Sequence, residues 1–249
     1  MSETSGYLAR PGGEHVAWRK VEGRGPAVVW LGGFKSDMAG TKAQALADWA
    51  LAAGRAYVRF DYFGHGESSG DFRQGTITRW REDALAVLEA LNDGQVVLVG
   101  SSMGGWIASL VAMAEPDRVK AMVLIAPAPD FTEKLMKPQI PPEGLADLAR
   151  DGVWLRPSEY GEPYPITREL LEDGARWSIL EAQEVPIEVP VRILQGGEDP
   201  DVPWSHALQL ANAIKGPDVV FTLIKDGDHR LSRPQDLERL IAALDEVAS

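Results

Sequence analysis

Short segments that are apolar at almost every position alternate with longer segments of helical periodicity along most of the chain. Strands of a parallel sheet are buried on both faces, so they are typically apolar throughout rather than at every second position. Segments of this kind are residues 15–21, 27–31, 56–60, 96–100, 121–125, 191–195 and 219–224. Helices are expected between them at residues 41–53, 78–91, 106–114, 204–214 and 234–247. The pattern predicts an α/β fold with a mainly parallel central sheet covered by helices on both faces, in which the two earliest strands pair as an antiparallel edge.

Residues 127–190 interrupt this alternation. The segment holds 10 of the 17 prolines of the chain, together with several aromatic and many charged residues. Proline lacks a backbone hydrogen-bond donor, so we expect no regular strands here. A long insert in an α/β domain more often covers a functional site than forms a structureless loop. The sequence therefore predicts one domain over residues 1–249 with a small, partly helical cap at 127–190. The alternative is a surface excursion whose aromatic side chains pack only on one another.

The composition narrows the classes of function. A balance of 37 acidic against 25 basic residues gives a formal charge of −12, which disfavours nucleic acid and anionic membranes as partners. Cysteine is absent, which excludes disulfides and a cysteine nucleophile, and the four histidines lack metal-ligand spacing. The sequence contains neither an apolar run long enough to span a membrane nor an N-terminal signal peptide. We therefore expect a cytosolic protein without a metal site or a nucleic-acid partner.

The most specific local signal is the Gly-x-Ser-x-Gly motif at residues 100–104, Gly-Ser-Ser-Met-Gly. It lies directly after a predicted strand and directly before a predicted helix. A serine on such a sharp turn needs neighbours without a Cβ, because only then can the helix pack closely while the hydroxyl stays exposed. This strand-turn-helix context is the one that a nucleophile elbow requires. Ser102 is therefore the candidate nucleophile.

A serine nucleophile needs a base within hydrogen-bond reach. His229 follows the last predicted strand and so falls at the carboxyl edge of the sheet, where Ser102 also lies and where open α/β sheets bind ligands. We therefore expect His229 to be the base; the alternative is a solvated loop histidine. Of the other histidines, His65 is expected in a turn near the rim of the site, His206 to pack or cap a helix, and His15 to face solvent.

The base in turn needs a third group that holds its tautomer. Residues 196–203 form a turn that places several carboxylates at the end of the strand before the last. Asp199 is the candidate acid because it lies early on that turn. Glu198 and Asp201 are expected to face solvent or to cap the helix that begins near residue 204.

An oxyanion hole needs two backbone N–H groups that point at the charge developing on the substrate carbonyl oxygen. One is expected from Met103, the residue after the nucleophile. The other is expected from Phe34, because Gly32 and Gly33 before it allow the backbone to approach a ligand closely. The alternative for these two glycines is a plain turn.

Two further features are weaker. Residues 61–68, Asp-Tyr-Phe-Gly-His-Gly-Glu-Ser, follow a strand and are rich in turn formers, so we expect a structural loop in which Asp61 binds nearby backbone amides. Trp106 and Trp204 could line an acyl pocket, although aromatic residues at the starts of helices are more often part of the core.

Taken together, these residues resemble the α/β-hydrolase superfamily over essentially the whole chain. More narrowly, three segments are similar to the family of mitochondrial palmitoyl-protein thioesterases that also act as acyl-glucuronide esterases. These are residues 31–42, 59–70 and 202–204. The resemblance implies that Ser102, Asp199 and His229 form a catalytic triad. It is weakest in residues 127–190.

The expected function is that of a serine hydrolase that cleaves carboxylic esters or thioesters of small molecules or acylated proteins without a cofactor. A serine at position 102 argues against the dehalogenases and epoxide hydrolases of the superfamily, in which the resemblance implies an aspartate. One alternative is a peptidase or amidase whose cap carboxylates anchor an amine terminus; these are Glu159, Glu162, Glu169 and Glu172. Another is a non-catalytic binding module that uses the groove under the cap.

Overall fold

The computed structural model describes residues 2–157 and 163–248, which fold around one large sheet. The order of its strands is β1-β2-β4-β3-β5-β6-β9-β10. Their bounds are Glu3–Arg10, Glu14–Val21, Arg55–Phe60, Arg24–Leu31, Val96–Ser101, Val119–Ile125, Val191–Gly196 and Val219–Ile224 in the same order. All neighbouring strands from β4 to β10 are parallel. The predicted α/β architecture with a mainly parallel sheet is thus confirmed.

The predicted pairing of the two earliest strands is wrong. Strand β2 pairs antiparallel with β1 on one side and with β4 on the other, whereas β3 lies between β4 and β5. Because β3 has a parallel neighbour on each edge, it has no free edge at which β2 could pair. The edge strand β1 escaped prediction because its sequence, Glu-Thr-Ser-Gly-Tyr-Leu-Ala-Arg, has no apolar run, and it is more exposed than the central strands.

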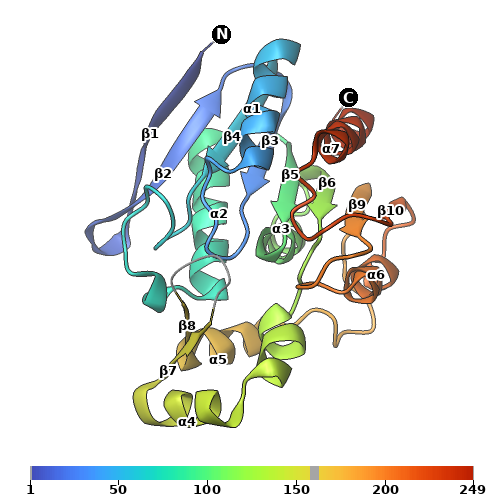
Figure 1. Cartoon of the computed structure of the whole chain (residues 1–249). Coiled ribbons are helices and arrows are strands. Elements are labelled where there is room, and N and C mark those ends of the chain that lie inside the picture. The colour runs from blue at the N-terminus through green and yellow to red at the C-terminus, as the bar shows by residue number, and fades with distance from the viewer. Residues whose placement is uncertain (1, 158–162, 249) are drawn as a thin grey trace.

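Helices cover both faces of the sheet. Helices α1 (Thr41–Ala53) and α7 (Pro234–Val247) lie on one face, and α2 (Ile77–Leu91), α3 (Met103–Ala114) and α6 (Trp204–Ala213) on the other (Figure 1). Alternate residues of β3 point to opposite layers: Val29 and Leu31 pack with one group of helices, and Val28 and Trp30 with the other. Burial on both faces explains why the strands read as continuous apolar runs.

The described residues of the insert, 127–157 and 163–190, lie at one end of the sheet, drawn in green to orange in the lower part of Figure 1. The insert contains a π-helical turn (Thr132–Met136), a 3₁₀ turn (Lys137–Gln139), α4 (Pro142–Asp151), β7 (Val153–Arg156), β8 (Tyr164–Thr167) and α5 (Arg168–Arg176). Two further 3₁₀ turns, Pro11–Gly13 and Phe72–Gln74, lie in the main domain.

The prediction that this insert contains no strands is wrong, since β7 and β8 pair antiparallel. Pro165 lies in β8 opposite Leu155. A ribbon of two strands consists of edges only, so a proline can be placed there without breaking a continuous ladder. In the part of the chain that the structure describes, no helix combines the length and the apolar character needed to cross a bilayer.

Candidate active site

Ser102 lies on the turn that joins β5 to α3. Its backbone has φ 54° and ψ −118°, a conformation that costs a residue with a Cβ roughly 1–3 kcal/mol. The turn is held by the Ser102 N–H, which donates to the Ile125 carbonyl at 2.9 Å. It is also sterically tight, because a Cβ on Gly104 would collide with the carbonyl oxygen of Leu31. The glycine of the motif therefore allows α3 to begin immediately beside the sheet, with Ser102 at its N-terminus.

The structure brings His229 to Ser102 across more than a hundred residues of sequence. The Nε2 atom of His229 lies 3.1 Å from the Ser102 Oγ, and its Nδ1 atom lies 2.8 Å from Asp199 Oδ2. His229 follows β10 and Asp199 follows β9, and these strands are parallel neighbours. Their carboxyl ends therefore meet at one edge, as expected for this fold class.

The environment of Asp199 differs from those of the neighbouring carboxylates. Its side chain is fully buried and accepts hydrogen bonds from the backbone N–H groups of Asp201 and Val202 and from the Gln195 amide. Glu198 and Asp201 are exposed. Among these acids it is Asp199 that carries the bond to the imidazole.

A cavity of about 430 Å³ opens beside Ser102 and His229. One wall is apolar and comes largely from the insert; its residues are Met103, Ala128, Phe131, Leu135, Met136 and Val202. The lining also includes four basic and two acidic side chains: Lys35, Lys42, Arg156, Arg230, Asp201 and Asp228. The cavity thus combines an apolar wall with a mainly basic set of charged side chains beside the serine hydroxyl.

Phe34 and Met103 both line this cavity together with Ser102. Met103 is the first residue of α3, so its N–H belongs to the unpaired positive end of a helix. Phe34 lies on the loop after β3, where a Cβ built on Gly33 would lie 3.5 Å from the Cβ of Ser102. The two expected oxyanion donors therefore belong to two segments that meet at the nucleophile, the loop after β3 and the start of α3.

The remaining histidines lie outside this cavity. His206 is buried and its Nε2 donates to the Pro129 carbonyl at 2.7 Å, in agreement with a packing role. His15 is half-buried and stacks edge-on against Tyr7. His65, expected in a turn near the rim, is only 4% exposed and lies beneath the loop that carries Phe34.

The structure also places Trp106, Trp204 and Asp61, which the sequence analysis singled out. Neither Trp106 nor Trp204 lines the cavity. Trp106 is fully buried, and Trp204 is 46% exposed. Asp61 accepts from the backbone amides of Met38 and Glu67, as the loop pattern indicates.

Lys42 is a residue of the site that the sequence did not reveal. It lies in the first turn of α1 and its Nζ donates to the carbonyl of Arg230, next to His229. Burial lowers the pKa of Lys42 to about 8, against the opposing effect of Asp228. No local motif marks Lys42, Arg156 or Leu135, since each reaches the cavity only through the tertiary fold.

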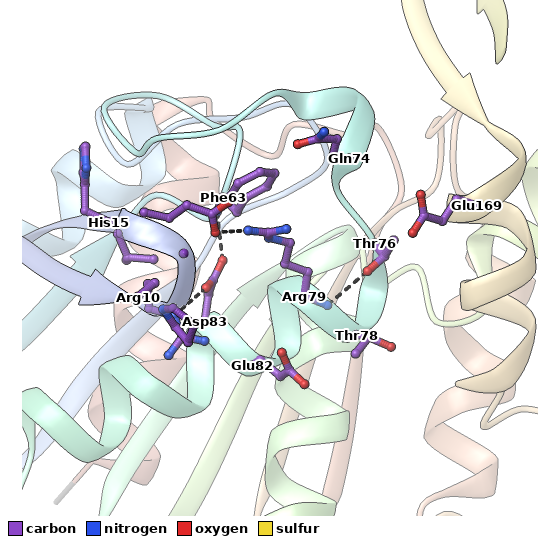
Figure 2. Close-up of a pocket in the computed structure, with 14 residues that line it drawn as sticks. Arg10, His15, Phe63, Gln74, Thr76, Thr78, Arg79, Glu82, Asp83 and Glu169 are labelled. Carbon is purple, nitrogen blue, oxygen red and sulfur yellow. Dashed lines mark hydrogen bonds and ion pairs between the residues drawn. The ribbon is translucent and has the colours of Figure 1, made fainter. Parts of the chain in front are cut away.

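A second cavity, of about 530 Å³, lies between β1, β2 and α2, and Phe63 of the residue 61–68 loop is part of its lining (Figure 2). Although its volume is larger, both arginines that line it are held in ion pairs. Arg10 forms an ion pair with Asp83, and Arg79 with Glu14. Of these two cavities, the one beside Ser102 is the better candidate because it combines open space with a hydrogen-bonded serine, histidine and carboxylate.

Within the described residues, one group has the spacing of metal ligands: Asp199, Asp201 and His229, with ligand atoms within 4.8 Å of one another. Asp199 Oδ2 and His229 Nδ1 are already bonded to each other. The expectation that the protein has no metal site therefore stays a prediction.

Comparison with known proteins identifies relatives over nearly the whole chain. The family model for the alpha/beta hydrolase fold matches residues 43–150. The mitochondrial palmitoyl-protein thioesterase ABHD10 of Bos taurus is 35% identical over 243 residues, which cover 97% of this chain and 79% of that protein. The human protein of the same name is 34% identical over 243 residues, which cover 97% of this chain and 79% of that protein.

Solved structures agree. A putative hydrolase from Agrobacterium vitis S4 superposes with a TM-score of 0.94 at 43% identity, covering 100% of this chain and 99% of that one. Alpha/beta hydrolase domain-containing protein 10 from mouse superposes with a TM-score of 0.89 at 34% identity, covering 98% and 97%.

These comparisons overturn one expectation. The cytosolic location expected from the first residues is wrong, because the matching mammalian relatives are named mitochondrial. An import signal is separate from the folded domain, so the composition of that domain does not report the compartment. The fold, the order of the motifs and the extent of the similarity lead to one assignment: this chain is an α/β hydrolase and belongs to the family of the mitochondrial palmitoyl-protein thioesterase ABHD10.

Proposed function

We propose that this α/β hydrolase cleaves carboxylic esters or thioesters through an acyl-enzyme on Ser102. The observation that carries the proposal is the hydrogen-bonded series Ser102–His229–Asp199 at the mouth of a cavity with an apolar wall. A hydroxyl, an imidazole and a buried carboxylate in this order are the parts that nucleophilic acyl transfer needs.

The geometry supports the following steps. Ser102 Oγ attacks the substrate carbonyl carbon while His229 Nε2 takes its proton, and the Phe34 and Met103 amides hold the resulting oxyanion. The tetrahedral intermediate collapses, and His229 returns the proton to the departing alcohol or thiol. Water then attacks the acyl-enzyme with His229 again as base, which releases the carboxylic acid and restores Ser102. Throughout, Asp199 holds the Nδ1–H of His229 and stabilises the imidazolium.

The cavity favours an acyl group on the apolar wall and a polar leaving part at the entrance. We assign the acyl site to the wall formed by Met103, Phe131, Leu135 and Met136, most of which belongs to the insert. Residues 127–190 thus act as a cap that contributes to substrate selection. The relatives named palmitoyl-protein thioesterase support an acylated substrate of this kind.

The peptidase alternative has less support. Glu159 and Glu162 lie outside the described residues, and the exposed Glu169 and Glu172 do not line the cavity beside Ser102. The basic side chains that line the cavity would also repel a protonated amine terminus. A non-catalytic binding module, in turn, has no need for a strained serine aligned with a base.

The test is the turnover of matched p-nitrophenyl esters and acyl thioesters with chains of two to sixteen carbons. We expect kcat/KM to rise with chain length until the apolar wall is filled, and to be lost in Ser102→Ala. Ser109→Ala is the matched control, because Ser109 lies in the same helix and only bonds to the Gly105 carbonyl. Turnover that survives in Ser102→Ala would contradict the proposal.

A further inference from the structure

The loop that carries Phe34 depends on a second loop for its shape. Residues 33–36 form a tight turn in which the Ser36 N–H donates to the Gly33 carbonyl at 3.1 Å. Phe34 and Lys35 are the two central residues of this turn. Lys35 has φ 57°, a left-handed conformation that a residue with a Cβ rarely adopts. Something outside the turn must therefore stabilise it.

That support comes from His65. The Lys35 N–H donates to His65 Nε2 at 3.1 Å, and His65 Nδ1 lies 3.0 Å from the Phe63 carbonyl oxygen. A backbone N–H can only donate and a carbonyl can only accept, so Nε2 is the acceptor and Nδ1 carries the proton. The imidazole thus connects the residue after Phe34 to the backbone of the neighbouring loop.

The surroundings keep His65 in this form. The ring is 4% exposed and packs edge-on against Phe72 and Trp80, with ring centres 5.0 and 5.3 Å away. Burial lowers the pKa of His65 to about 4, so the ring is neutral near pH 7 and Nε2 is free to accept. The Trp80 Nε1 also donates to the Phe63 carbonyl and fixes the anchor of the imidazole.

A second bond holds the far end of the same loop. The buried Asp61 accepts from the Met38 N–H at 2.6 Å and from the Glu67 N–H at 2.8 Å. A Cβ on Gly66, which has φ 44°, would collide with the Asp61 carboxylate. Residues 61–68 therefore hold residues 35 and 38 of the loop that carries Phe34.

We propose that His65 is a positioning residue for the oxyanion hole: by accepting from the Lys35 N–H, it fixes the turn that aims the Phe34 amide at the substrate oxygen. His65 does not line the cavity and acts only through Lys35 and Phe34. The inference rests on the proposed hydrolase function. Misplacement of such a donor by about 1 Å costs on the order of 100-fold in rate.

The test compares His65→Asn with His65→Gln. The amide of Asn reproduces the Nδ1 donor to Phe63 but cannot reach Lys35, whereas the Oε1 of Gln can take the place of Nε2 as acceptor. We expect kcat on an ester substrate to fall roughly 10–100-fold in His65→Asn with KM changed less than about threefold, and to recover most of this loss in His65→Gln. The inhibition constant of an acyl trifluoromethyl ketone, which binds as an oxyanion, should rise by a factor similar to the loss in kcat/KM.

Tyr57→Phe is the control for lost stability. It removes one buried hydrogen bond, from the Tyr57 hydroxyl to the Ala43 carbonyl, in the core layer on the other side of the sheet. We expect a lower melting temperature with kcat unchanged. Equal kcat in His65→Asn and wild type, or an equal loss in His65→Asn and His65→Gln at matched melting temperatures, would overturn the role of His65. A wild type that hydrolyses no ester or thioester would instead overturn the proposed function.

Discussion

Asp199 and Asp201 show how two similar side chains on one turn acquire different roles. Asp199 is buried, accepts two backbone N–H groups and bonds to His229, whereas Asp201 is exposed at the cavity rim. The position of Asp199 on the turn was visible in the sequence, because a carboxylate at the end of a strand lies at the ligand-binding edge. Its burial was not visible, since the Gln195 amide and the loop around it close over the carboxylate only in the folded chain.

This difference predicts the effect of two matched substitutions. Asp199→Asn should lower kcat by roughly 10³- to 10⁴-fold, because the imidazole loses the group that holds its tautomer and stabilises its charged form. Asp201→Asn should lower kcat less than about tenfold. Steady-state kinetics on one ester substrate would measure both, and an equal loss in the two variants would contradict the assignment of Asp199.

The buried imidazole of His65 links stability to pH. Its pKa is lowered to about 4 in the folded chain, whereas an unfolded histidine titrates near 6.5. The unfolded chain therefore takes up the proton first, so the contribution of His65 is fully present above about pH 6.5 and is lost as the pH falls towards 4. The buried Asp61 and Asp83 act in the opposite direction, because burial raises their pKa values.

Urea unfolding of wild type and His65→Gln at pH 7 and pH 4.5 isolates this contribution. Between the two values of pH, the stability of wild type should fall by about 2–3 kcal/mol more than that of His65→Gln. A difference in unfolding free energy between the two proteins that is independent of pH would show that His65 does not titrate as described.

At the scale of elements, most strands and helices could be predicted from the sequence because burial on both faces makes the strands continuously apolar. Helices α1 and α7 and strand β10 have the expected bounds. Strand β1 and the ribbon of β7 and β8 could not be predicted from the sequence, because β1 is an exposed edge strand and β8 contains Pro165. The pairing of β2 with β4 also escaped prediction, since it joins segments that are far apart in the sequence.

The insert is the element whose side chains we expect to set acyl chain length. Leu135 lies on the cavity wall, whereas Leu145 in α4 is 55% exposed and does not line the cavity. Leu135→Phe should shorten the preferred acyl chain and lower kcat/KM for the longest substrates by roughly tenfold. Leu145→Phe should leave the preference unchanged. Chain-length profiles that coincide in the two variants would exclude this wall as the acyl site.

At the scale of the whole molecule, the distribution of charge is uneven. The chain carries a formal charge of −12, yet four basic residues line the cavity beside Ser102: Lys35, Lys42, Arg156 and Arg230. Composition alone could not show this, because the fold brings residues 35 and 42 together with the distant residues 156 and 230. Such a local field attracts anionic groups although the molecule as a whole repels them.

This distribution predicts a dependence on ionic strength. The KM for an ester with an anionic leaving group should rise with added salt, whereas the KM for a neutral ester of the same acyl chain should stay nearly constant. Arg156→Gln should raise the first KM roughly three- to tenfold at low salt. Arg150→Gln is the control, since the exposed Arg150 is paired with Asp147 and Asp151 away from the cavity. Identical salt dependence for the anionic and the neutral ester would contradict an attraction between the basic side chains of the cavity and an anionic leaving group.

The proposed mechanism requires a covalent acyl intermediate on Ser102. Its most direct test is intact and peptide mass spectrometry of the protein after reaction with a fluorophosphonate, with wild type and Ser102→Ala compared under the same conditions. We expect one adduct on wild type, located on Ser102, and none on Ser102→Ala. A wild type that remains unmodified, or an adduct on another residue that persists in Ser102→Ala, would contradict it.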